Sequence, residues 1–118
     1  MNSASAFHQW LSGFGLPAYA ATSVPDNAKL PYFTYSFALA SFGIESSVQV
    51  NLWHGGSEAS ANAKAEEVHD SLGLGGTTIA TDDGGIWLKR GSPSWFAAQD
   101  PSDVKHRVIN VTIENLGG

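Results

Sequence analysis

The chain has 118 residues, of which six are Lys or Arg and eleven are Asp or Glu, so its formal net charge is −5. A negative chain repels phosphate, so we do not expect it to wrap nucleic acid. It contains no cysteine, which excludes disulfides, thiol nucleophiles and cysteine-ligated zinc. A chain of this length has room for one hydrophobic core, so we expect a single domain over residues 1–118.

The first ten residues, MNSASAFHQW, contain neither a basic segment nor a continuous apolar run. This pattern is unlike a secretory signal peptide. No stretch of the chain approaches the ~18 apolar residues of a membrane span. We therefore expect a protein that is made in the cytoplasm and has no membrane partner.

Residues 1–30 are predicted to form a helix and an extended connection. Between residues 4 and 14, four apolar residues recur at the spacing of one helical stripe: Phe7, Trp10, Leu11 and Phe14. Ser3 or Ser5 is the expected N-cap. The stripe either packs in the core or docks on a neighbouring subunit, and core packing is favoured. Residues 15–31 hold three prolines and many small residues, which is typical of an extended connection.

The sheet and helix core is expected over residues 31–118. Residues 32–39 and 47–53 alternate apolar and polar side chains, which predicts an antiparallel hairpin with one wet face. Ser57 is a natural N-cap for a helix that runs to Leu72. Its predicted buried stripe consists of Ala61, Ala65, Val68 and Leu72.

A second hairpin and a closing strand follow. Residues 77–81 and 86–90 flank the segment Asp-Asp-Gly-Gly, a composition that favours a compact turn. Residues 91–103 are expected to form a loop, and residues 104–116 a long strand. Together these elements predict an α+β fold, in which a mostly antiparallel sheet of four to five strands carries two helices on one face.

The sequence offers little catalytic equipment. The four histidines have no HxH or HxxxH spacing, and no serine lies in a G-x-S-x-G elbow. Glu66 and Glu67 are adjacent on a helix, so they point about 100° apart and make a poor acid/base pair. We therefore predict no enzyme, no cofactor and no metal site, and His69 with Glu66 and Asp70 is interpreted as a solvated helix face.

Several segments resemble the tail terminator and tail-completion proteins of long-tailed bacteriophages, also called minor tail or minor capsid proteins. The resemblance covers roughly residues 30–116 and lies in LPYFTYSFALASFG, in VQVNLWHGGSEASANAKAEEVHDSLG and in GGIWLKRGSPSWFAAQDPSDVKHRVINVTIENL. Two departures are the apolar Trp95 and Phe96, where the family pattern is more polar, and His106, where an arginine is common.

The resemblance implies a structural virion protein that forms a ring, usually a hexamer, with no active site. Such a ring caps the finished tail tube and offers a surface for head-tail joining. The implied partners are further copies of the chain, the tail-tube protein and the neck or head connector proteins, while DNA only passes through the lumen. The protein would be located in the tail or neck of the virion, after assembly in the host cytoplasm.

The residues expected to contact other subunits or partners fall into three groups. Acidic residues gather on the second helix, basic residues gather in the C-terminal third, and two aromatic residues lie in the predicted 91–103 loop. They are Glu66, Glu67, Asp70, Lys89, Arg90, Trp95, Phe96, Lys105 and Arg107. Opposite charges on two patches suit a head-to-tail contact between copies, although both patches are also typical of solvated faces. The aromatic pair either covers the core or contacts a partner.

Two alternatives to a tail terminator remain open at this point. One is a head-completion or connector protein of the same neck, which the sequence does not separate from a terminator. The other is a small ligand-binding α+β domain, with a pocket lined by Trp53, His54 and Trp87.

Overall fold

The computed structural model describes residues 1–99 and 102–117. In these ranges two helices and six strands follow one another as α1 (Ser3–Ser12), β1 (Ala18–Ala20), β2 (Tyr32–Tyr35), β3 (Glu45–His54), α2 (Glu58–Leu72), β4 (Thr77–Thr81), β5 (Gly84–Ala98) and β6 (Lys105–Asn115). Neither helix of this described part is long and apolar enough to cross a membrane.

The six strands form one sheet in the order β1-β2-β3-β6-β5-β4. The pair β1–β2 is parallel, and every other neighbouring pair is antiparallel. The fold is therefore α+β as expected, but the prediction of four to five antiparallel strands is wrong in detail. The missed strand is β1, which is only three residues long and lies in the predicted connection between residues 15 and 31.

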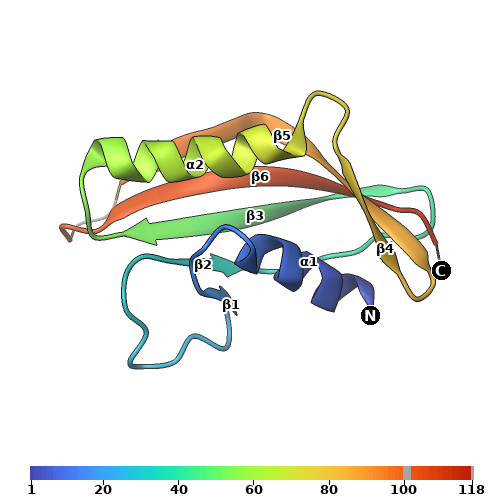
Figure 1. Cartoon of the computed structure of the whole chain (residues 1–118), viewed down its shortest axis with the longest axis horizontal. Coiled ribbons are helices and arrows are strands. Elements are labelled where there is room, and N and C mark those ends of the chain that lie inside the picture. The colour runs from blue at the N-terminus through green and yellow to red at the C-terminus, as the bar shows by residue number, and fades with distance from the viewer. Residues whose placement is uncertain (100–101, 118) are drawn as a thin grey trace.

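Both helices pack on the same face of the sheet, around one core. Alternate residues of the central strands point into it, and Val50 on β3 and Ile109 on β6 are completely buried. α2 contributes Ala61, Ala65, Val68 and Leu72, which are all buried as the helical spacing predicts. α1 contacts both β1 and β4, the two edge strands, so the sheet curls and α1 spans its opening (Figure 1).

The helix ends follow local rules. Ser57 caps α2 as predicted, since its side chain accepts a hydrogen bond from the amide of Ser60. α1 begins one residue earlier than predicted, and the expected caps Ser3 and Ser5 are wrong, because Asn2 is the cap and accepts from the amide of Ser5. Phe7 of the stripe is completely buried, so α1 belongs to the core.

The prediction of a loop over residues 91–103 is wrong for most of that range. Strand β5 continues to Ala98, and only residues 100–101 of the predicted loop lie outside the described residues. The ladder with β6 is interrupted by a bulge between Arg90 and Trp95. The bulge accommodates Pro93, which cannot donate to a strand ladder, so the proline interrupts the strand without ending it.

The bulge depends on Gly91. A Cβ atom added to Gly91 would lie 2.6 Å from the Cβ atom of Asn110 and 2.7 Å from its carbonyl oxygen. The side-chain amide of Asn110 donates to the carbonyl of Pro93 at 2.8 Å, so this side chain is held in place beside Gly91. The main chain therefore approaches β6 too closely for any side chain at position 91.

Gly91→Ala should lower the free energy of unfolding by about 1–3 kcal/mol, because the backbone must shift to relieve the contact with Asn110. Gly75→Ala is the matched control, since a Cβ added there meets no described atom within 4 Å. The control should change stability by less than about 1 kcal/mol. Urea unfolding of both variants measures the difference, and equal stabilities would show that the bulge is not a close contact.

Candidate functional site

The acidic and basic residues singled out in the sequence are largely paired inside one chain. Arg90 on β5 donates from Nε to the carbonyl of His69 at 3.2 Å, and its Nη2 lies 3.9 Å from the carboxylate of Asp70. Trp95 donates from Nε1 to Glu66 at 2.7 Å. The two charge groups therefore meet as contacts between α2 and β5, which leaves less of either for a partner.

Arg107 is a structural residue in this arrangement. Its side chain is 3% exposed and lies under the first turns of α2. The guanidinium donates to Asn62 at 2.8 Å, to the carbonyl of His106 at 3.0 Å, and to the carboxylate of Glu58. These bonds tie β6 to the start of the helix, so Arg107 is not available at the surface.

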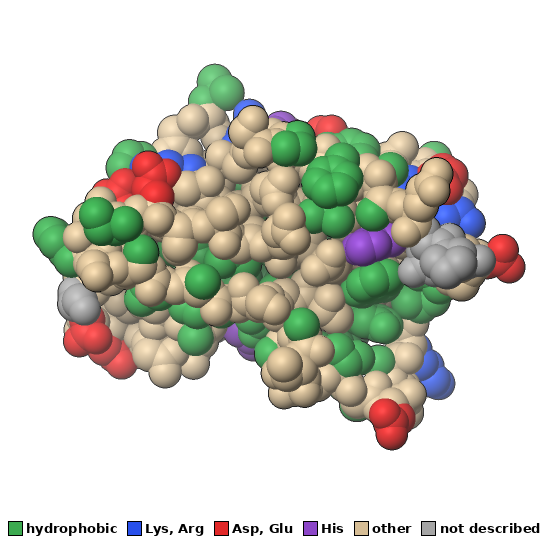
Figure 2. All heavy atoms as spheres, turned by 180° about the vertical axis from the view of Figure 1, so that it is seen from behind, with side chains coloured by type: hydrophobic (Ala, Val, Ile, Leu, Met, Phe, Trp, Pro, Cys, Tyr) green, Lys and Arg blue, Asp and Glu red, His purple; other side chains and the backbone are tan. Residues whose placement is uncertain are grey.

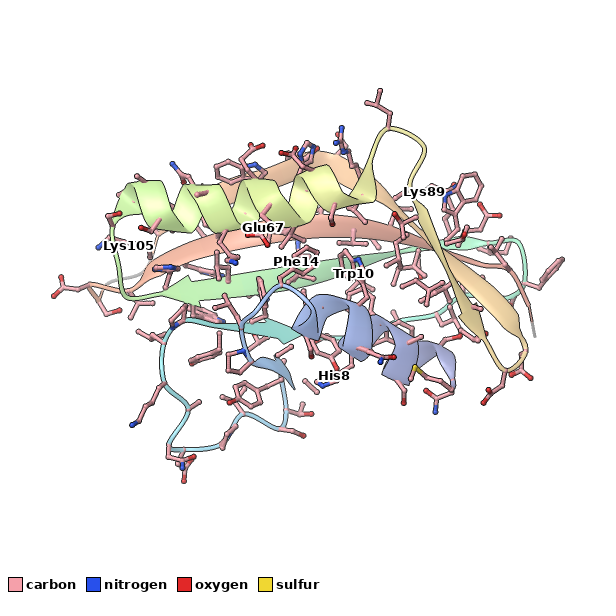
Figure 3. All side chains as sticks on the ribbon, in the orientation of Figure 1. His8, Trp10, Phe14, Glu67, Lys89 and Lys105 are labelled. Carbon is pink, nitrogen blue, oxygen red and sulfur yellow. The ribbon has the colours of Figure 1, made fainter. Side chains whose placement is uncertain are left out.

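Lys89 and Lys105 lie at opposite ends of the sheet (Figure 3). Lys89 contacts Glu114 at 2.9 Å and Glu45 at 3.7 Å, and its ammonium lies 3.8 Å from the centre of the Trp87 ring. The hydrogen bond to Glu114 is the main cause that raises the pKa of Lys89 above its usual value of 10.5. Lys105 donates to the main-chain carbonyl of Asp103 at 3.0 Å.

The remaining predicted contact residues differ in exposure. Glu67 is exposed on the side of α2 toward Phe14 and pairs with Lys64 at 2.9 Å (Figure 3). Trp95 is half-buried and packs against the core. Of its two expected roles, core cover or partner contact, the structure therefore shows the first. Phe96 points to the opposite, helix-free face of the sheet, where it is 40% exposed. The two aromatic side chains therefore do not act together.

The chemistry of a metal site is weak in the described residues. Glu66, His69 and Asp70 bring ligand atoms within 4.8 Å of one another on α2. However, Glu66 already accepts from Trp95, and the positive guanidinium of Arg90 lies beside Asp70. A nearby cation disfavours a second one, so we do not assign a metal to this cluster.

The other histidines have structural partners. His8 contacts the hydroxyl of Tyr35 at 2.8 Å, and His54 accepts from the amide of Gly56 at 2.9 Å. His106 stacks on Trp53, with ring centres 3.9 Å apart and planes 15° apart. Trp53 also donates to Thr34 at 2.9 Å, which fixes the ring on the helix-free face.

The segment that joins β2 to β3 displays exposed apolar side chains that the predicted contact residues do not include. Residues 36–44, which join β2 to β3, carry Leu39, Phe42 and Ile44, with exposures of 40%, 68% and 55%. We call these three side chains the apolar tip. The signal in the sequence is the run ALASFGI, which is unusually apolar for a turn.

The apolar tip is held firmly by Asn115 at the end of β6. Asn115 is 2% exposed, and its side chain donates to the carbonyl of Ala40 at 2.9 Å and accepts from the amide of Gly117 at 3.0 Å. The main-chain carbonyl of Asn115 accepts from the amide of Gly43 at 2.7 Å, and its main-chain amide donates to the carbonyl of Ile44 at 3.4 Å. An apolar surface that is already ordered loses little entropy when a partner binds.

No family model matches the chain, and no curated protein matches it in sequence. The resemblance to phage tail-completion proteins therefore remains an expectation from the sequence.

Replacing Arg107 should separate its structural role from a surface role. Arg107→Met keeps the apolar stem but loses the bonds to Glu58 and Asn62, so we expect a loss of about 2–3 kcal/mol in the free energy of unfolding. Lys105→Met, two positions away on the same strand, should change stability by less than about 0.5 kcal/mol. Urea titrations followed by tryptophan fluorescence measure both values. A small loss in both variants would contradict the structural role of Arg107.

Proposed function

We propose that the chain is a structural protein of a phage tail or neck that acts by assembly and carries no catalytic residue. Copies of the chain form a ring, a hexamer as the resemblance implies, which caps the tail tube and offers the surface for joining to the head. The partners are the tail-tube protein and the neck proteins, and DNA passes through the lumen. The protein is located in the virion, after assembly in the host cytoplasm.

The observation that carries this proposal is the apolar tip. Phe42 and Ile44 are both more than half exposed, yet Asn115 orders the segment that displays them. Exposing apolar side chains lowers solubility, so several of them on one ordered segment favour a protein contact over a solvated turn. The resemblance over residues 30–116 is to proteins that assemble into rings, which supports the interpretation of this contact as one made during assembly.

A second observation agrees with this proposal. The helix-free side of the molecule is mostly uncharged toward its centre, while charged side chains lie toward the ends and the rim (Figure 2). Depletion of charge in the centre of a surface is typical of protein interfaces. A ring with this chain's net charge of −5 would also let DNA pass without binding it, because phosphate is repelled.

The proposal predicts rings of one defined size. Light scattering should give a single oligomer mass for the purified protein, and negative-stain electron microscopy should show rings, or closed ends on tail tubes to which the protein is added. Binding to tail tubes supports a terminator, whereas binding to portal-bearing heads supports the head-completion role. A strict monomer that binds neither tubes nor heads would contradict both.

A further inference from the structure

The two ends of β3 carry different surfaces. At its start lies the apolar tip, and at its end, ten residues or about 30 Å away, lies an aromatic cluster on the helix-free face. We define the aromatic cluster as Tyr32, Trp53 and Phe96. Tyr32 is paired with Trp53 across β2 and β3, and Phe96 is paired with Val108 on β5 and β6.

The apolar tip has an acidic surround. Glu45 begins β3, and Asp82 and Asp83 form the turn between β4 and β5. This turn lies against Leu116 and Gly117, which follow Asn115. Glu45 shares Lys89 with Glu114, and Asp82 pairs with the N-terminal amine. The described residues at this end thus bring four carboxylates and only two cations, Lys89 and the N-terminal amine, so the end is negative. Two apolar tips that approached each other would therefore repel.

The aromatic cluster is a better binding surface for the apolar tip than a second tip is. Its own side chains carry no charge, and the ring of Trp53 is fixed by Thr34 and by stacking on His106. Rigid aromatic side chains concentrate binding energy, because they bury a large area at little entropic cost. Phe96 is 40% exposed, so it has surface left to bury.

Lys29 and Lys105, the two lysines that contact no carboxylate of the described residues, lie at this same end. Among the described residues, each of the other Lys and Arg side chains contacts a carboxylate: Lys64 with Glu67, Lys89 with Glu114, Arg90 with Asp70 and Arg107 with Glu58. Lys105 faces His54 at the end of β3, and Leu30, next to Lys29, lies beside Gly55. Asp26 and Asp103 precede Lys29 and Lys105 closely in sequence. Counting the described residues alone, this end therefore carries less negative charge than the tip.

We propose that the apolar tip of one copy docks on the aromatic cluster of a second copy, with Lys29 and Lys105 facing the carboxylates that surround the tip. The contact joins two different patches, so it is head-to-tail and generates a ring when its rotation closes. The inference rests on the proposed function in that it identifies the contact between subunits of the ring.

The absence of native cysteine allows a direct test by cross-linking. Ser41→Cys places a thiol beside Phe42 in the tip, and Ala98→Cys places one opposite His106, next to the aromatic cluster. Ala63→Cys, on the exposed side of α2, is the control. Each variant is treated with a short bismaleimide alone and in pairwise mixtures at equal total concentration.

The head-to-tail contact predicts efficient linkage only in the mixture of Ser41→Cys with Ala98→Cys. Linkage of Ser41→Cys alone would mean that tips meet tips, and linkage of Ala98→Cys alone would mean that sheet faces meet each other. Equal linkage of Ser41→Cys with Ala63→Cys would mean a different surface or random collision. Each of these three results, or no linkage in any mixture, overturns the proposal.

A pair of matched substitutions tests the contact between subunits independently of the proposed function. Phe42→Asp should reduce the oligomer to a monomer in light scattering, whereas Leu74→Asp should leave its mass unchanged. Leu74 is 97% exposed but lies between α2 and β4, outside both patches. Rings that survive Phe42→Asp would overturn this contact and leave the proposed function standing. Failure of the unmodified protein to bind tubes or heads would overturn the function and leave the contact standing.

Discussion

The structure depends on the pairing of β6 with strands on both of its sides. β6 aligns with β3 over the whole length of β3 and with β5 on either side of the bulge, and Ile109, Val111 and Ile113 are completely buried between them and the helices. Each end of the strand then fixes another part of the molecule. Arg107 binds the start of α2, and Asn115 orders the segment that displays the apolar tip. The core and the candidate surfaces thus share one strand.

Elements with local signals could be predicted from the sequence. The cap and stripe of α2 depend on residues within one helix, and the turn between β4 and β5 depends on a few consecutive residues. β1 could not be predicted, because three residues, Ala-Tyr-Ala, show no alternation and their parallel partner lies fifteen positions away. The continuation of β5 past Pro93 was hidden because its bulge is stabilised by Asn110 on another strand.

The candidate site was predicted less well, for a related reason. The positions of the charged residues are visible in the sequence, but their pairing joins residues far apart in it, such as Arg107 and Glu58. A sequence without a fold does not distinguish such an internal pair from two complementary surfaces. Ser41 and Gly43 are typical turn residues, so the sequence between the two predicted strands indicates only a connection. Their neighbours Phe42 and Ile44 were the signal that a turn alone does not explain.

The central claim is that β6 holds the apolar tip in an ordered conformation before any partner binds. Native-state hydrogen exchange of the Gly43 amide, followed by NMR, tests it most directly, because that amide donates to the carbonyl of Asn115. We predict that Gly43 exchanges slowly, with a protection close to that of the β6 amides. Exchange of Gly43 at the rate of a free loop amide, while β6 stays protected, would contradict the account.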